Sequence, residues 1–148
     1  MIFKRVNRTL AESVFVVFQA NEASIAADDV VALELTAASV DGVKIAQPST
    51  SPTGLNAVVG IADAAISNGA YGLVQVYGYR STSRVNASGT SMAAGFHLIP
   101  VGGSDHLAPL DTVGYSKGMI GNFVLLESAA SSAGAASTVS AKIFIRCM

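Results

Sequence analysis

Short runs of β-branched and aromatic residues alternate with polar or glycine-containing segments along most of the chain. In residues 30–36, Val31, Leu33 and Leu35 fall on one side of an extended backbone, while Ala32 and Glu34 fall on the other. Such a period of two is typical of a β-strand. The pattern predicts strands at 13–19, 30–36, 43–47, 57–62, 71–79, 83–87, 96–101, 107–115, 119–127 and 142–146.

Residues 57–79 form the best-defined segment of this pattern. Two β-rich runs, 57–62 and 71–79, flank a connector of small residues that contains Asn68-Gly69. Asn and Gly both tolerate a positive φ, so this pair is a strong turn signal. No segment carries a sustained helical period. We therefore expect an all-β fold, a single compact β-barrel or β-sandwich of about eight to ten short strands.

The beginning of the chain differs from the rest in its charge. Residues 1–12 are basic and mixed in pattern, which predicts an N-terminal arm before a single β domain at 13–148. The same residues imitate a secretory signal, because basic residues precede the apolar run 14–18. Glu12 and the shortness of that run favour an arm leading into a first strand. No apolar run reaches the roughly 20 residues of a membrane span, so no membrane partner is expected.

Charged residues are scarce for a chain of 148 residues. They make up 13% of the sequence, against roughly 25% in an average soluble domain. The formal net charge of −1 argues against a nucleic-acid groove, which needs a concentrated basic surface. Two readings of the scarcity remain open. Either other proteins cover much of the surface, or Ala, Ser and Gly cover it.

One segment resembles a catalytic motif. Gly89-Thr90-Ser91-Met92-Ala93 is similar to the residues around the nucleophilic serine of subtilisin-like proteases. In that family the histidine precedes the serine, whereas His97 and His106 both follow Ser91. The order of the triad is therefore broken, and a small serine hydrolase using Ser91 is a remote alternative.

The other candidate metal-binding and thiol groups lack the further ligands or cysteines that such sites need. Asp105-His106 is at most half of a metal site, and Asp28-Asp29 does not lie in an Asp-rich loop of the length that calcium requires. A single cysteine, Cys147, cannot form an internal disulfide. We expect no catalytic residues, no cofactor and no metal.

What remains is an interaction surface. Tyr77, Tyr79, Arg80 and Arg84 cluster in the sequence and are residue types enriched at protein–protein hot spots. Alternatively, the tyrosines cap the end of a barrel strand and the arginines are solvated. The arm, with Phe3, Lys4, Arg5 and Arg8, could reach an acidic surface of a neighbour, or it could be disordered.

The chain also resembles small virion proteins of tailed bacteriophages over about two-thirds of its length. The opening residues 1–9 look like the start of such proteins. The matching positions further along are Val58-Val59-Gly60-Ile61-Ala62, Ile66, Gly69, Tyr71-Gly72, Val74-Gln75-Val76-Tyr77-Gly78, Gly89-Thr90, Ala94-Gly95 and Leu98-Ile99-Pro100.

This resemblance implies a capsid decoration, or cement, protein. Such a protein is made in the host cytoplasm, binds the outer surface of the assembled head and stabilises it by bridging subunits of the major capsid protein. The resemblance also implies a homo-oligomer, either a dimer or a trimer. The alternative within the virion is a structural protein of the tail or of a fibre base.

Overall fold

The predicted all-β class is confirmed by the structure, a computed structural model that describes residues 12–21, 24–35, 42–50, 55, 57–87, 91–110, 122–129 and 138–147. Leu55 is the one residue in these ranges with helical backbone, and the regular elements are strands. They are β1 (Ser13–Ala20), β2 (Val30–Leu33), β3 (Lys44–Ala46), β4 (Val58–Ala62), β5 (Tyr71–Arg80), β6 (Arg84–Asn86), β7 (His97–Pro100), β8 (Leu107–Pro109), β9 (Phe123–Leu125), β10 (Thr138–Ser140) and β11 (Ile143–Arg146).

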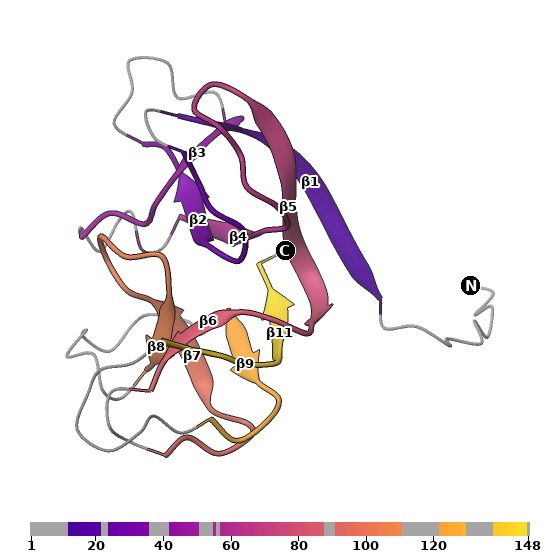
Figure 1. The fold of residues 1–148 in the computed structure, drawn as a ribbon, viewed down its shortest axis with the longest axis vertical. Helices are drawn as coiled ribbons and strands as arrows, with labels where there is room; N and C mark the ends of the chain where they lie inside the picture. The colour runs from indigo at the N-terminus through magenta and orange to yellow at the C-terminus, as the bar shows by residue number, and fades with distance from the viewer. Residues whose placement is uncertain are drawn as a thin grey trace, which may run out of the picture.

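Five of these strands close into a barrel, seen in the upper half of Figure 1. The strand order is β1-β3-β2-β4-β5, and β5 pairs back onto β1 in antiparallel register. The closure depends on a short parallel contact, in which Gln19 and Ala20 of β1 lie beside Lys44 and Ile45 of β3. The remaining strands continue from β5 in the order β11-β9-β7-β8-β6-β10 and form the lower half.

Strand β5 joins the two halves. It pairs with β1 and β4 of the barrel, and its last residues, Tyr77–Arg80, pair with β11. The turn predicted at Asn68-Gly69 lies just before β5, and Gly69 has a φ of +76°. The segment 57–79 therefore holds β4, the turn and most of β5, as the sequence pattern predicts.

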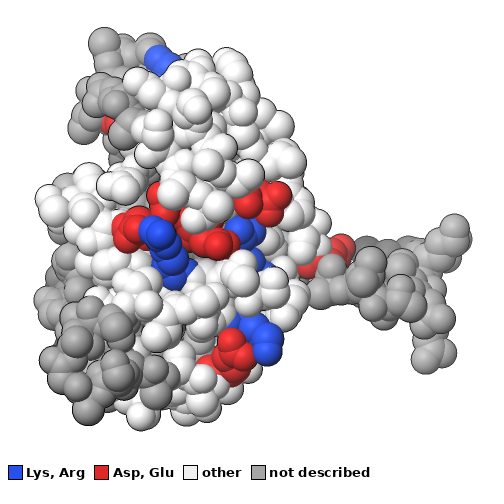
Figure 2. Space-filling view, viewed as in Figure 1, with Lys and Arg blue, Asp and Glu red and all other residues white. Residues whose placement is uncertain are grey.

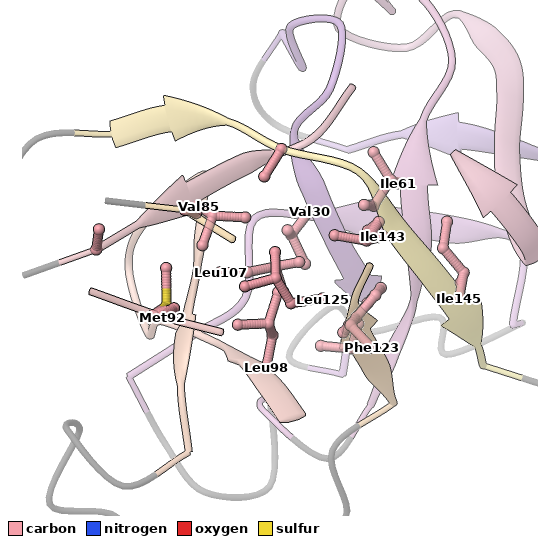
Figure 3. Packing of buried hydrophobic residues seen from close by; sticks show 14 of the residues in the cluster. Val30, Ile61, Val85, Met92, Leu98, Leu107, Phe123, Leu125, Ile143 and Ile145 are labelled. Carbon is pink, nitrogen blue, oxygen red and sulfur yellow. The ribbon is translucent and has the colours of Figure 1, made fainter. Parts of the chain in front are cut away.

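Two hydrophobic cores lie on opposite sides of the barrel wall. The barrel core contains Phe18, Ala20, Ile25, Val31, Ile45, Ala62, Ile66, Val74 and Val76. The second core fills the space between the outside of β2 and β4 and the lower strands (Figure 3), and includes Val30, Ile61, Val85, Leu98, Leu107, Phe123, Leu125, Ile143 and Ile145.

Strand β2 differs from its predicted pattern because it lies between the two cores. Ala32 was expected on a polar face with Glu34, but Ala32 is buried in the second core while Val31 is buried in the barrel core. Both faces of β2 are covered, because the lower half packs against the outside of the barrel at this strand. An alternating pattern by itself indicates one covered face.

Most strand positions agree with the pattern, and one strand is missed. β10 at Thr138–Ser140 is not predicted, because three small or polar residues after an Ala/Ser/Gly-rich segment carry little β signal. β10 forms by pairing with β6, opposite Arg84, Val85 and Asn86. The division into an arm at 1–12 and a domain at 13–148 stays a prediction, since residues 1–11 lie outside the described ranges.

The contact between β4 and β5 leaves no room for a side chain at Gly60. A Cβ atom built there would collide with the main-chain carbonyl of Gln75. Gly60→Ala should therefore lower the free energy of unfolding by roughly 3 kcal/mol, the upper end of what overpacking costs. Urea denaturation monitored by circular dichroism measures this change.

The matched control is Gly42→Ala. Gly42 has a φ of +71° but no atom within 4 Å of an added Cβ. This variant should lose only about 1 kcal/mol, from backbone strain alone. Equal losses for the two variants would contradict the close β4–β5 contact.

Candidate functional site

Part of the outer side of the β1–β5 pair is apolar and open to solvent. Val17 lies opposite Leu73, and Phe15 and Gln19 lie opposite Gln75 and Tyr71. The exposed fractions of the four large side chains are 41% for Phe15, 55% for Val17, 63% for Tyr71 and 47% for Leu73. We call this set of four residues the ribbon face.

Strand alternation creates the ribbon face. Phe18, Val74 and Val76 point into the barrel core, so the residues between them along each strand point outward. Gly72 is on the inner side and sits against the Ile66 side chain, where a Cβ atom would collide. The barrel core thereby fixes which side chains of β1 and β5 are directed outward.

The four residues of the predicted aromatic–arginine cluster lie in different surroundings. Tyr77 is half-buried and packs edge-to-face on Phe144 of β11, with ring centroids 5.3 Å apart. Tyr79 is also half-buried, and lines a hollow with Arg80. The interface role of Tyr77, Tyr79, Arg80 and Arg84 stays a prediction. The structure does not gather them on one open surface.

Arg80 is buried, with 7% of its surface exposed. Its Nη2 atom lies 2.7 Å from Asp28 Oδ1, and its Nη1 atom lies 3.3 Å from Asp63 Oδ1. The guanidinium also donates to Gln75 Oε1 and to the main-chain oxygen of Ala62. The planar donor set of Arg is therefore used within the molecule, where it ties the end of β5 to the turns before β2 and after β4.

Arg84 makes a second set of ion pairs beside the first. Its Nη1 atom lies 3.2 Å from Asp29 Oδ1 and also contacts Asp105. His106 Nδ1 lies 3.1 Å from the other oxygen of Asp105. Arg84 keeps 43% of its side chain exposed, unlike Arg80.

Burial and hydrogen bonding shift the two carboxyl groups in opposite directions. Burial raises the pKa of Asp29, although its Oδ2 accepts a hydrogen bond from the Ala26 N–H. Partial burial also acts to raise the pKa of Asp105. The hydrogen bond to His106 and the charge of Arg84 outweigh that effect, so the pKa of Asp105 lies below its usual value.

These groups form a charged band across the middle of the face seen in Figure 2. The band consists of Asp28, Asp29, Asp63, Arg80, Arg84 and Asp105. Two hollows of about 310 and 450 Å³ open along it, and Asp28 lines both. Each arginine is shared between two carboxylates, which makes the band a set of internal ion pairs.

The other candidates for chemistry are dispersed. Ser91 is exposed, and no hydrogen bond joins it to His97 or His106 within the described ranges. In the part of the chain that the structure describes, no three His, Cys, Asp or Glu residues converge as metal ligands. Cys147 packs against the second core, and burial raises the pKa of its thiol to about 12. Phe3, Lys4, Arg5 and Arg8 lie outside the described residues.

Sequence reasoning missed the ribbon face. The signal was available in part, since Phe15 and Val17 alternate with Val14, Val16 and Phe18. Both sides of this run are apolar, so the pattern could not tell which side would be covered.

Among the described residues, no helix has the length and apolar character needed to cross a membrane.

If Arg80 serves the fold, its removal should cost stability. Arg80→Ala should lower the free energy of unfolding by about 2–3 kcal/mol, because it removes the cation beside Asp28 and the donor to Gln75 Oε1. Arg80→Lys should recover only part of this loss, since an ammonium cannot replace the planar fork.

Arg84→Ala is the comparison variant for the same urea-unfolding measurement. It should lose less, about 1 kcal/mol, because Arg84 itself is 43% exposed and the buried Asp29 still accepts a hydrogen bond from the Ala26 N–H. An Arg80→Ala protein that is as stable as wild type would show that the Arg80 ion pairs do not hold the two turns.

Comparison with known proteins gives limited information. No model of a protein family matches the chain, and no curated protein matches it. Among solved structures, it is similar to the crystal structure of the head fiber gp8.5 N base in bacteriophage phi29. The TM-score is 0.48 and the sequence identity 14%, over 90% of this chain and 94% of that chain. Because both values are low, no property of that protein is carried over to this one.

Proposed function

We propose that this chain is a structural protein of a phage virion. In this proposal it decorates the outer surface of the assembled head and stabilises it by bridging subunits of the major capsid protein. The observation that carries the binding role is the ribbon face, where Phe15, Val17, Tyr71 and Leu73 are all more than one-third exposed. Exposed apolar side chains that lie side by side on a sheet face are typical of an interaction site.

The composition supports the same role. Charged residues make up only 13% of the chain, and six of them are joined in the charged band. The ion pairs within the band already neutralise one another in part. The surface that gains most from contact with another protein is therefore the apolar one, because association removes it from water.

The virion setting comes from the resemblance of the sequence to small virion proteins. Its central positions lie in β4, in the turn that follows and in β5. Burying the ribbon face would contribute on the order of 1 kcal/mol per side chain, which is modest for a single copy. Repetition over a capsid lattice would raise the total through avidity.

A binding experiment with purified heads of the phage that encodes the chain tests this function. Heads should bind the wild-type protein and withstand a higher temperature with it than without it. Leu73→Glu should weaken binding at least tenfold, because it places a charge in the centre of the ribbon face. Co-sedimentation with the heads measures the binding.

Leu126→Glu is the matched control, since Leu126 is 42% exposed and lies just after β9, away from the ribbon face. It should bind as wild type does. The proposal is wrong if heads do not bind the wild-type protein, or if binding does not respond to Leu73→Glu. Imaging of the particles separates decoration from a tail or fibre-base position, because decoration copies would be spread over the shell.

The N-terminal arm gives a second test of the same function. Deletion of residues 1–8 removes Lys4, Arg5 and Arg8 and should weaken attachment to heads several-fold, with a steeper effect at low salt. The unfolding temperature of the shortened protein should stay near that of wild type. Unchanged attachment would exclude a role for the arm.

A further inference from the structure

Strand β1 has an open edge. On one side β5 pairs with it from Ser13 to Gln19. On the other side, within the described ranges, β3 pairs with it only at Gln19 and Ala20. Figure 1 shows β1 at the right-hand margin of the barrel, beside β5. Residues 13–18 therefore present one side of their backbone to solvent.

The direction of each backbone group follows from the bonds at the end of β1. The Gln19 N–H donates to Val43 O on the β3 side, and the Ala20 N–H donates to Ala70 O on the β5 side. Backbone groups alternate in direction along a strand. Ser13, Phe15 and Val17 therefore direct their N–H and C=O groups toward the open edge.

The open edge lacks the charges and prolines that keep such edges apart, and the register shift in its pairing with β5 places the extra residue, Val76, on β5. Residues 13–18 contain no charged residue and no proline. Phe15 and Val17 are exposed, and Val16 between them is 39% exposed as well. An uncharged, apolar edge strand is a template for pairing with another chain.

We propose that β1 pairs in antiparallel register with β1 of a second copy of this chain, about a two-fold axis at Phe15. This register places Phe15 opposite Phe15 of the second copy, and Ser13 opposite Val17. All the backbone groups that face the open edge then find partners. Centring the axis on Val17 would instead place Phe15 opposite Gln19, whose edge β3 already occupies.

A second copy fits this edge because the edge is complementary to itself. A two-fold axis brings each residue near its own equivalent, so a charge close to the axis would repel itself. The strand has none there, and the two Phe15 rings form a cross-strand aromatic pair.

The pairing joins the two ribbon faces on the same side of one continuous sheet. An axis perpendicular to a sheet keeps the outward side chains of both copies on one side. This inference goes beyond the proposed function, because dimer formation does not depend on binding to heads and can be measured on the isolated protein. A monomer that binds heads would overturn the dimer alone, and a dimer that ignores heads would overturn the proposed function alone.

Sedimentation of the purified full-length chain over a concentration series tests the proposal. Wild type should show a monomer–dimer equilibrium. Phe15→Lys should raise the dissociation constant at least tenfold, because two ammonium groups would meet at the axis. Leu126→Lys, at a site of similar exposure away from β1, should leave the constant unchanged.

Val17→Pro tests the hydrogen bonds themselves. The Val17 N–H faces the open edge, so proline removes no bond within the monomer but blocks the edge to a partner. This variant should unfold near the wild-type temperature and remain monomeric. In wild type, hydrogen exchange of the Phe15 and Val17 amides should slow as the concentration rises. A wild-type protein that stays monomeric throughout, or a dimer that survives both β1 substitutions, would overturn the proposal.

Discussion

The shared strand β5 is the constraint on which the rest of the structure depends. Its hydrogen bonds run to β1 and β4 in the barrel and to β11 in the lower half. Val74 and Val76 fill the barrel core, while Gln75 between them is buried on the outer side, opposite Ile61 of the second core. One strand thereby sets the position of two hydrophobic cores relative to each other.

This arrangement separates polar and apolar surfaces. The end of β5 carries Arg80, whose partners Asp28 and Asp63 come from turns of the barrel. The start of β5 carries Tyr71 and Leu73, which face solvent beside β1. The charged groups of the band are thus paired within the fold, whereas the apolar side chains of the ribbon face stay exposed. The division fits the proposed assembly role, since burying apolar surface is the dominant favourable term in most protein association.

The sequence was informative about local structure and less so about what covers each surface. Alternation and turn residues place most strands, because side-chain period and positive-φ turns are local properties. Burial of both faces of β2 and the pairing of β10 with β6 depend on distant segments, which no local pattern encodes. The same limit explains why the sequence pattern did not reveal the internal ion pairs of Arg80. An arginine at a strand end reads as solvated or as an interface residue, whereas its carboxylate partners lie far away in the sequence.

We propose that the chain presents the ribbon face to other proteins, and its orientation on a virion provides a decisive test. Electron cryo-microscopy of the virion, at a resolution that separates strands, would show which surface meets the shell. We expect the β1–β5 pair to lie against the capsid, with Phe15, Val17, Tyr71 and Leu73 buried in the contact. Particles that lack the chain, or a contact made by the charged band with the ribbon face left in solvent, would contradict it.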